Sequence, residues 1–111
     1  MFGLLKDKTP VLTEEEVRNL VKNDKKVTLL DVRNAMEYRP EHLTPCQHVD
    51  VREKDFKDKI KYYETDKTYI LYCKSGQRSK KARKIMTNMG FGNVYVLDGG
   101  INKWVGPLKI K

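Results

Sequence analysis

Apolar residues along this chain follow two alternating spacings, one typical of strands and one typical of helices. Short apolar runs that predict buried strands occur at 11–12, 27–32, 47–51, 69–72 and 94–97. Between these runs lie helix-like stretches at 13–21, 34–39, 52–64, 79–89 and 101–105. Strands that alternate with helices favour an α/β fold with right-handed crossovers and a mainly parallel sheet.

Local signals mark where several of these helices begin and end. Thr13 followed by Glu16 is a capping box, which opens the first helix. Pro40 should stop the short helix at 34–39, because proline cannot continue a helix interior. The pair at 99–100, Gly-Gly, predicts a turn that starts a last helix, with Trp104 in the core.

The length and composition of the chain fit one domain. Its 111 residues are 39% hydrophobic and contain no linker rich in glycine, proline or serine, so they can build one modest core. We expect an N-terminal extension at 1–10, the domain at 11–106 and a C-terminal tail at 107–111. The sequence contains no apolar run of signal-peptide or membrane-spanning length. This predicts a cytoplasmic protein, although a chain whose leader had been removed would look the same.

The formal net charge of +8 changes the picture at one place only. Most lysines are expected on the solvated faces of helices. The basic run at 78–84 could be a nucleic-acid patch, but Ala82, Ile85, Met86 and Met89 recur through it at helical spacing. It therefore predicts a helix with one apolar face. Its basic face would draw small anions toward the residues just before it.

Those residues include Cys73, which lies where the strand-like run 69–72 gives way to a helix that begins near Ser79. A strand-to-helix turn points successive backbone N–H groups inward, and the helix adds the positive end of its dipole. A thiolate is stabilised there, so we expect a lowered pKa for the Cys73 thiol and a role as nucleophile. In parallel sheets, ligands bind beyond the carboxyl ends of the strands, which is where Cys73 falls.

Four ordered motifs make the chain resemble a single-domain rhodanese. They are Leu-Asp-Val-Arg at 30–33, Glu-Tyr at 37–38 with His-Leu at 42–43, Cys-Lys-Ser-Gly-Gln-Arg-Ser at 73–79, and Leu-Asp-Gly-Gly-Ile at 97–101 with Trp104. The resemblance implies a five-stranded parallel sheet with helices on both faces. It also implies a thiosulfate sulfurtransferase without metal or organic cofactor, whose cysteine holds a sulfane sulfur as a persulfide and passes it to cyanide or a thiol.

The resemblance further implies roles for single residues. Cys73 would be the nucleophile. The residues that cradle the outer sulfur and bind substrate would be Lys74, Ser75, Gly76, Gln77 and Arg78. Arg78 would either contact a substrate oxygen or pair with a carboxylate that fixes the loop, with Asp31 and Glu37 as candidates. Asp31 and Arg33 are expected to form an ion pair that supports the loop.

The expected partners are a small anionic sulfur donor and a cyanide or thiol acceptor. A sulfur-relay protein is a further partner that the sequence allows. We expect a monomer that binds neither nucleic acid nor membrane.

Cys46, His42 and His48 are expected to be structural. No turn or helix terminus near Cys46 would activate its thiol, and a disulfide with Cys73 is disfavoured in a cytoplasmic protein. Sulfur transfer from a stabilised thiolate needs little proton transfer, and no further ligand lies at metal-binding spacing from either histidine.

Two other functions stay open. A cysteine phosphatase or arsenate reductase of related fold also combines a cysteine, a ring of amides and an arginine. Its loop, however, is one residue longer than the four residues between Cys73 and Arg78, because a tetrahedral oxyanion needs more donors. A module that carries sulfur from one protein to another would share every motif of the free-standing enzyme.

Overall fold

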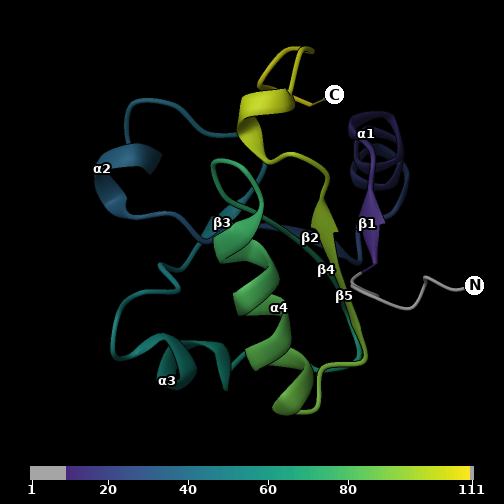
Figure 1. The fold of residues 1–111 in the computed structure, drawn as a ribbon. Coiled ribbons are helices and arrows are strands. Elements are labelled where there is room, and N and C mark those ends of the chain that lie inside the picture. The colour runs from purple at the N-terminus through teal and green to yellow at the C-terminus, as the bar shows by residue number, and fades with distance from the viewer. Residues whose placement is uncertain (1–9, 111) are drawn as a thin grey trace, which may run out of the picture.

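The computed structural model describes residues 10–110, which form one sheet with helices on both of its faces (Figure 1). The sheet has five parallel strands in the spatial order β1-β5-β4-β2-β3. The strands are β1 (Val11–Leu12), β2 (Val27–Asp31), β3 (Gln47–His48), β4 (Thr68–Tyr72) and β5 (Asn93–Leu97). The helices are α1 (Glu14–Asn23), α2 (Ala35–Tyr38), α3 (Phe56–Ile60), α4 (Gln77–Asn88) and the short 3₁₀ helix η2 (Ile101–Lys103). The predicted α/β fold is confirmed.

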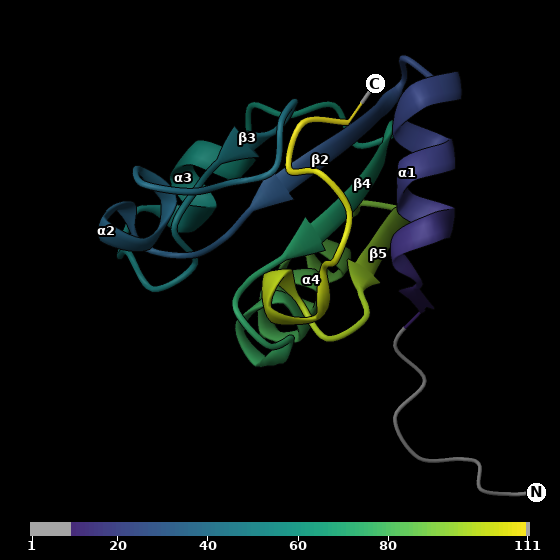
Figure 2. The ribbon, with the colours of Figure 1, turned by 90° about the horizontal axis from the view of Figure 1, so that it is seen from above.

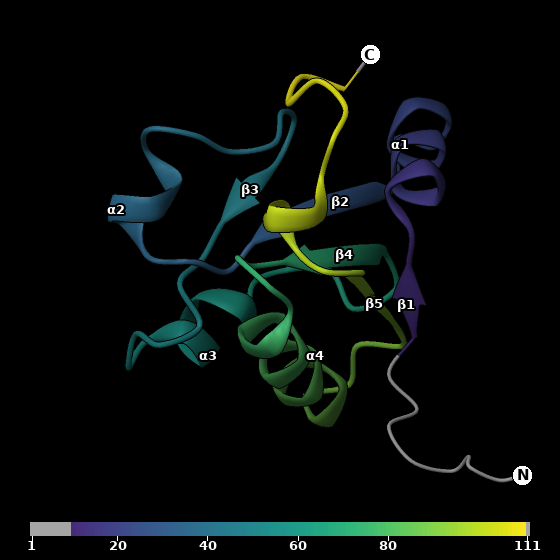
Figure 3. The same ribbon diagram turned by 45° about the horizontal axis from the view of Figure 1, so that its top comes forward.

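The two faces of the sheet carry separate hydrophobic clusters. Helix α1 covers one face, and α3 and α4 cover the other (Figures 2 and 3). Side chains of the central strand β4 alternate between the faces, as a strand requires. Ile70 and Tyr72 belong to the cluster under α1, whereas Leu71 and Cys73 belong to the cluster under α3 and α4. Cys73 therefore lies just past the end of β4, on the α4 face.

Parallel pairing places the loops that matter at one edge of the sheet. Strand β4 pairs with β2 along its whole length, up to Asp31 opposite Tyr72, and with β5 on its other side. The segment after β2, which leads into α2, therefore emerges beside the segment after β4, which leads into α4. Residues 31–38 and 73–78, far apart in the sequence, are brought to the same edge.

Several element boundaries differ from the prediction. The expected strand at 47–51 is regular only at β3, although its ladder continues: the N–H groups of Val49 and Val51 donate to the carbonyls of Asp31 and Val32. The helix in the stretch 52–64 is confined to α3, and α4 begins at Gln77 rather than near Ser79.

The expected helix at 101–105 is wrong, because only the three residues of η2 are helical. Trp104 is extended and only partly buried, and Val105 is 90% exposed. The Glu14 carboxylate accepts hydrogen bonds from the N–H groups of Val105 and Gly106, both at 2.7 Å. These N–H groups are thereby withdrawn from a helical pattern, and Pro107 follows directly.

Of the expected N-terminal extension at 1–10, only Pro10 lies within the described residues, whereas most of the expected C-terminal tail does. Residues 107–110 run beside the segment before β3, where Thr44 donates to the Leu108 carbonyl and accepts from Ile110. Among residues 10–110, no helix is both long enough and apolar enough to cross a membrane.

Candidate active site

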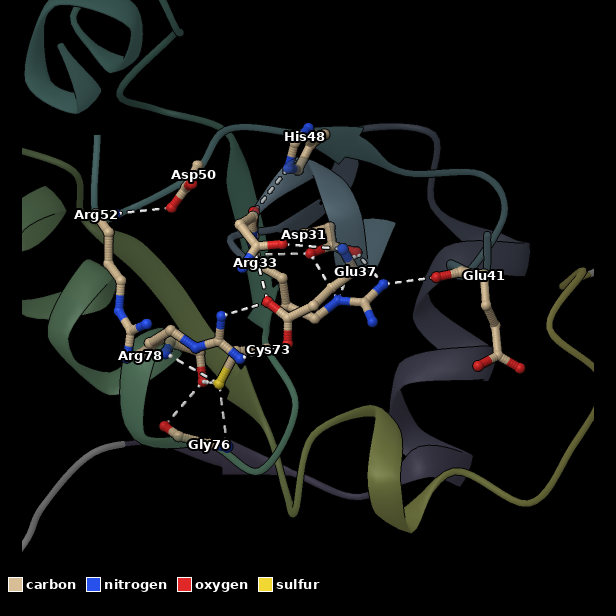
Figure 4. Close-up of polar contacts among 12 residues, drawn as sticks. Asp31, Arg33, Glu37, Glu41, His48, Asp50, Arg52, Cys73, Gly76 and Arg78 are labelled. Atoms are coloured by element: carbon tan, nitrogen blue, oxygen red, sulfur yellow. Dashed lines mark hydrogen bonds and ion pairs between the residues drawn. The ribbon is translucent and has the colours of Figure 1, made fainter. Parts of the chain in front are cut away.

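The Cys73 sulfur lies at the bottom of a cradle built by the turn between β4 and α4 (Figure 4). Only 1% of Cys73 is exposed. Its Sγ accepts hydrogen bonds from the backbone N–H groups of Gly76 at 3.1 Å and Ser79 at 3.4 Å. The Cys73 thiol donates to the Ser79 hydroxyl oxygen at 3.5 Å, and that hydroxyl donates to the Gly76 carbonyl at 2.9 Å. The two backbone N–H groups, and the Ser79 hydroxyl if it turns, can therefore stabilise negative charge on the sulfur once the thiol loses its proton.

The pKa of Cys73 reflects two opposing effects. Burial raises the pKa of the thiol, while hydrogen bonds from the Ser79 side chain and from the backbone N–H groups of Ser79, Gly76 and Ser75 lower it. The hydrogen bonds prevail, so the pKa of Cys73 lies below its ordinary value. By contrast, burial raises the pKa of Cys46 to about 11. Of the two cysteines, Cys73 is thus the one whose surroundings favour the nucleophilic thiolate.

Two glycines shape the backbone around this cradle. Gly76 precedes α4 with a φ of +120°, a conformation that residues with a Cβ rarely adopt. Gly100 has a φ of +63°, and a Cβ there would lie 2.5–2.6 Å from the carbonyl oxygens of Lys74 and Cys73. The next residue joins the two segments, because the N–H of Ile101 donates to the Cys73 carbonyl at 2.9 Å. The turn at 99–101 therefore braces the loop from outside.

Arg78 is held by Glu37 from α2. Its two terminal nitrogens donate to the two carboxylate oxygens at 2.6 and 2.9 Å, a bidentate pair. The Arg78 guanidinium is the main reason that the pKa of Glu37 falls to about 2. Glu37 is fixed in turn by the α2 capping box, where it exchanges hydrogen bonds with Asn34. Of the two carboxylates expected as partners of Arg78, the structure shows Glu37.

The other carboxylate, Asp31, is occupied by Arg33. The Arg33 guanidinium reaches both oxygens of Asp31, at 2.7–3.1 Å, and both side chains are buried. The same guanidinium also donates to the Glu41 carbonyl, at 2.7 Å. The expected ion pair is therefore present, and it joins the end of β2 to the segment after α2.

The remaining loop side chains point to solvent or lie apart. Lys74, Ser75 and Gln77 are exposed, so they lie at the surface of the loop. Cys46 packs against the cluster on the α1 face, with its sulfur 3.9 Å from the Tyr72 hydroxyl, and both cysteines are free. Residues 10–110 contain no group of three or more His, Cys, Asp or Glu side chains that could hold a metal ion.

The sequence pattern predicts no separate role for Ser79 or Gly100. The structure places Ser79 at the Cys73 sulfur and Gly100 against the carbonyl groups of Cys73 and Lys74. The spacing of Ser79, three residues after Gly76 in the first turn of a helix, is the signal that could have placed its side chain at the cradle. The backbone approach at Gly100 has no local signal, because its neighbours come from another part of the chain.

A model of the rhodanese-like domain family matches residues 13–107, nearly the whole chain. The chain belongs to the rhodanese-like domain family. Among its rhodanese-like relatives, the uncharacterized protein YqhL of Bacillus subtilis is 35% identical over 90% of this chain and 75% of its own length. The rhodanese-related protein of Thermoplasma volcanium, a crystal structure, has a TM-score of 0.71 at 27% identity and covers 86% of this chain and 89% of its own.

Relatives with functional names are longer than this rhodanese-like domain. YrkF of Bacillus subtilis, named as a sulfur carrier protein, is 32% identical over 87% of this chain, which spans 51% of YrkF. Others are named as tRNA uridine(34) hydroxylase or as adenylyltransferase/sulfurtransferase, and this chain spans 33% and 26% of their lengths.

Proposed function

We propose that this rhodanese-like domain is a sulfurtransferase that carries sulfane sulfur as a persulfide on Cys73. The observation that supports this most directly is the cradle of N–H groups and one hydroxyl around the Cys73 sulfur. Donors placed there favour the thiolate before reaction, and amides of the same loop would stabilise the negative charge on the outer sulfur of a persulfide. The names of sulfur carrier and sulfurtransferase relatives point to the same chemistry.

The reaction has two displacements at sulfur. The Cys73 thiolate attacks the outer sulfur of thiosulfate, a new S–S bond forms, and sulfite leaves with the electron pair of the bond that breaks. Cyanide or a thiolate then attacks the outer sulfur of the persulfide. The Cys73 thiolate leaves with that electron pair, so thiocyanate or a new persulfide is released and the enzyme is regenerated.

The contacts of Arg78 and Lys74 suggest different roles for these two cationic side chains. Arg78 has both terminal nitrogens on Glu37, so we assign it to fixing the loop rather than to holding the donor. Lys74 is exposed at the rim of the loop and is available to attract the sulfonate end of thiosulfate. This division also disfavours a phosphatase, which needs its arginine on the bound oxyanion.

The acceptor must come from outside the chain. Cys46, the second cysteine, lies on the opposite face of the sheet from Cys73. An internal disulfide that would release the sulfur cannot form without rearranging the sheet. Transfer to the thiol of another protein is therefore the second candidate, favoured by the similarity to YrkF.

A thiosulfate:cyanide assay tests the proposal. We expect thiocyanate formation to be lost in Cys73→Ser and kept in Cys46→Ser, a matched change of the other cysteine. Turnover retained by Cys73→Ser, or lost in a folded Cys46→Ser, would overturn it. Stoichiometric sulfur loading on Cys73 without turnover on cyanide would instead favour the protein-to-protein carrier.

A further inference from the structure

Helix α2 carries Glu37, and apart from the capping box between Asn34 and Glu37 little within the helix holds it in place. It has four residues, Ala35–Tyr38, and no side chain among them is fully buried. An isolated helix of this length does not persist, because helix nucleation costs more than one or two hydrogen bonds return. Since Glu37 must stay opposite Arg78, something else has to fix α2.

The Tyr38 ring is clamped between two imidazoles. The His42 ring stacks on one side with a centroid distance of 3.9 Å and an angle of 9° between the planes. The His48 ring stacks with a distance of 4.2 Å and an angle of 10°. Three nearly parallel rings in direct contact leave Tyr38 little freedom to rotate or withdraw. Because Glu37 is the adjacent residue, a fixed Tyr38 also fixes the direction of the Glu37 side chain.

Each imidazole is itself tied to the backbone. His42 Nδ1 lies 2.7 Å from the Tyr38 carbonyl, and His48 Nε2 lies 2.7 Å from the Arg33 carbonyl. A carbonyl can only accept, so each of these ring nitrogens donates. His42 therefore satisfies a carbonyl at the end of α2. His48 belongs to β3 and is in register with Asp31 of β2, so it connects the stack to the sheet. Figure 4 shows His48 above the end of β2, close to Arg33.

We propose that Tyr38 is a positioning residue for the sulfur site, which acts by holding Glu37 against Arg78. Arg78 lies in the first turn of α4, directly before Ser79, whose N–H and hydroxyl contact the Cys73 sulfur. The sheet thus supports the cradle through a continuous path from His48 to Tyr38, Glu37 and Arg78. No atom of Tyr38 needs to touch the substrate.

Alkylation of Cys73 by iodoacetamide as a function of pH tests this without any sulfur transfer. In Tyr38→Ala we expect the cradle to loosen and the thiol pKa to rise by about half a unit, which slows alkylation about threefold at pH values below the pKa. Tyr38→Phe keeps the stacked ring and should match the wild type. Tyr62→Ala is the matched control, because Tyr62 is 81% exposed and follows α3 rather than the sulfur site. An unchanged profile in folded Tyr38→Ala, or an equal shift in Tyr62→Ala, would overturn the proposal.

A double-mutant cycle tests the path itself. Glu37→Gln keeps the capping box but removes the carboxylate that Arg78 binds, so adding Tyr38→Ala to it should change the alkylation profile no further. An equal effect of Tyr38→Ala in both backgrounds would show that Tyr38 does not act through Glu37. If Tyr38→Ala does not fold, Tyr38→Leu keeps side-chain volume without the aromatic stack, and the same two outcomes apply to it.

The role in sulfur transfer rests on the proposed function, but the two fail differently. A wild-type protein that forms no persulfide would refute the proposed function, while the alkylation profiles would still decide the role of Tyr38. Conversely, active Tyr38→Ala with a wild-type profile would refute only the role of Tyr38.

Discussion

Replacing Ser79 by alanine should raise the pKa of Cys73 and make its thiol less reactive near neutral pH. Ser79 is fully buried, and its hydroxyl oxygen accepts from the Cys73 thiol at 3.5 Å. Once the thiol ionises, the same hydroxyl can turn and donate to the thiolate. The Ser79 side chain is also the largest of the hydrogen-bond contributions that lower the pKa of Cys73 against the effect of burial. The change Ser79→Ala removes this donor and leaves the Ser79 backbone N–H in place.

The size of the effect follows from how the hydroxyl is shared. A hydrogen bond to a charged group contributes about 1.5–3 kcal/mol. Because the same hydroxyl also donates to the Gly76 carbonyl at 2.9 Å, we take roughly half of this. One pKa unit corresponds to about 1.4 kcal/mol, so the pKa of Cys73 should rise by about 0.5–1 unit. At pH values below the pKa, alkylation should slow about three- to tenfold.

The fold should tolerate this substitution. The Gly76 carbonyl loses the hydroxyl but still accepts from the backbone N–H of Lys80 at 3.1 Å. The loss of one neutral hydrogen bond costs about 1 kcal/mol of the free energy of unfolding. A thermal or urea unfolding curve measured beside the kinetics separates this cost from the change in reactivity.

The assay is the rate of iodoacetamide alkylation measured across the titration of the thiol at constant ionic strength. The control is Ser75→Ala, because Ser75 lies in the same loop but is exposed, and its contribution to Cys73 comes from the backbone N–H. Its profile should match the wild type. The reasoning would be refuted by a Ser79→Ala profile that superposes on the wild type, or by an equal shift in Ser75→Ala.

Three further predictions test other parts of the account. Glu37→Gln should lower the free energy of unfolding by about 1 kcal/mol near neutral pH, allowing for partial solvent screening. The pKa of Glu37 is about 2 in the folded protein against an ordinary 4.5, so urea unfolding should show this difference above pH 4.5 and lose it as the pH falls toward 2. A difference that does not depend on pH would contradict the pairing with Arg78. Gly100→Ala should lower thermal stability more than Gly90→Ala, because both positions have positive φ but only a Cβ at 100 meets backbone atoms, and equal losses would contradict the bracing contact. Raising the ionic strength to about 0.15 M should lower kcat/KM for thiosulfate if the basic surface steers the anion, and a flat rate would assign that charge to solubility or to a macromolecular partner.

Much of the fold could be predicted because the central strands are buried on both faces. Strands β2, β4 and β5 are short, mostly apolar runs, and the capping box predicts where α1 begins. The last helix could not be predicted correctly. Helical spacing is present at Ile101, Trp104 and Val105. However, the N–H of Val105 donates a hydrogen bond to the carboxylate of Glu14, 91 residues away in the sequence. A local pattern does not contain a contact of that range.

The candidate site was predictable to a similar degree. The position of Cys73 at an anion-binding turn follows from the strand-to-helix pattern, whereas the place of Gly76 in the cradle came from the resemblance to the rhodanese family. The partner of Arg78 did not follow, because Asp31 and Glu37 were equally plausible carboxylates. The structure separates them, since Arg33, two residues along from Asp31, binds it with its backbone N–H as well as its side chain. Competition among neighbours for one carboxylate depends on geometry that the sequence does not contain.

The central claim is that Cys73 carries the sulfur. Intact-protein mass spectrometry after incubation with thiosulfate, for the wild type, Cys73→Ser and Cys46→Ser, tests it most directly. The account predicts that wild type and Cys46→Ser each gain the mass of one sulfur atom, that a reductant removes it, and that Cys73→Ser gains nothing. Sulfur added to Cys73→Ser, or no sulfur added to the wild type, would contradict the account.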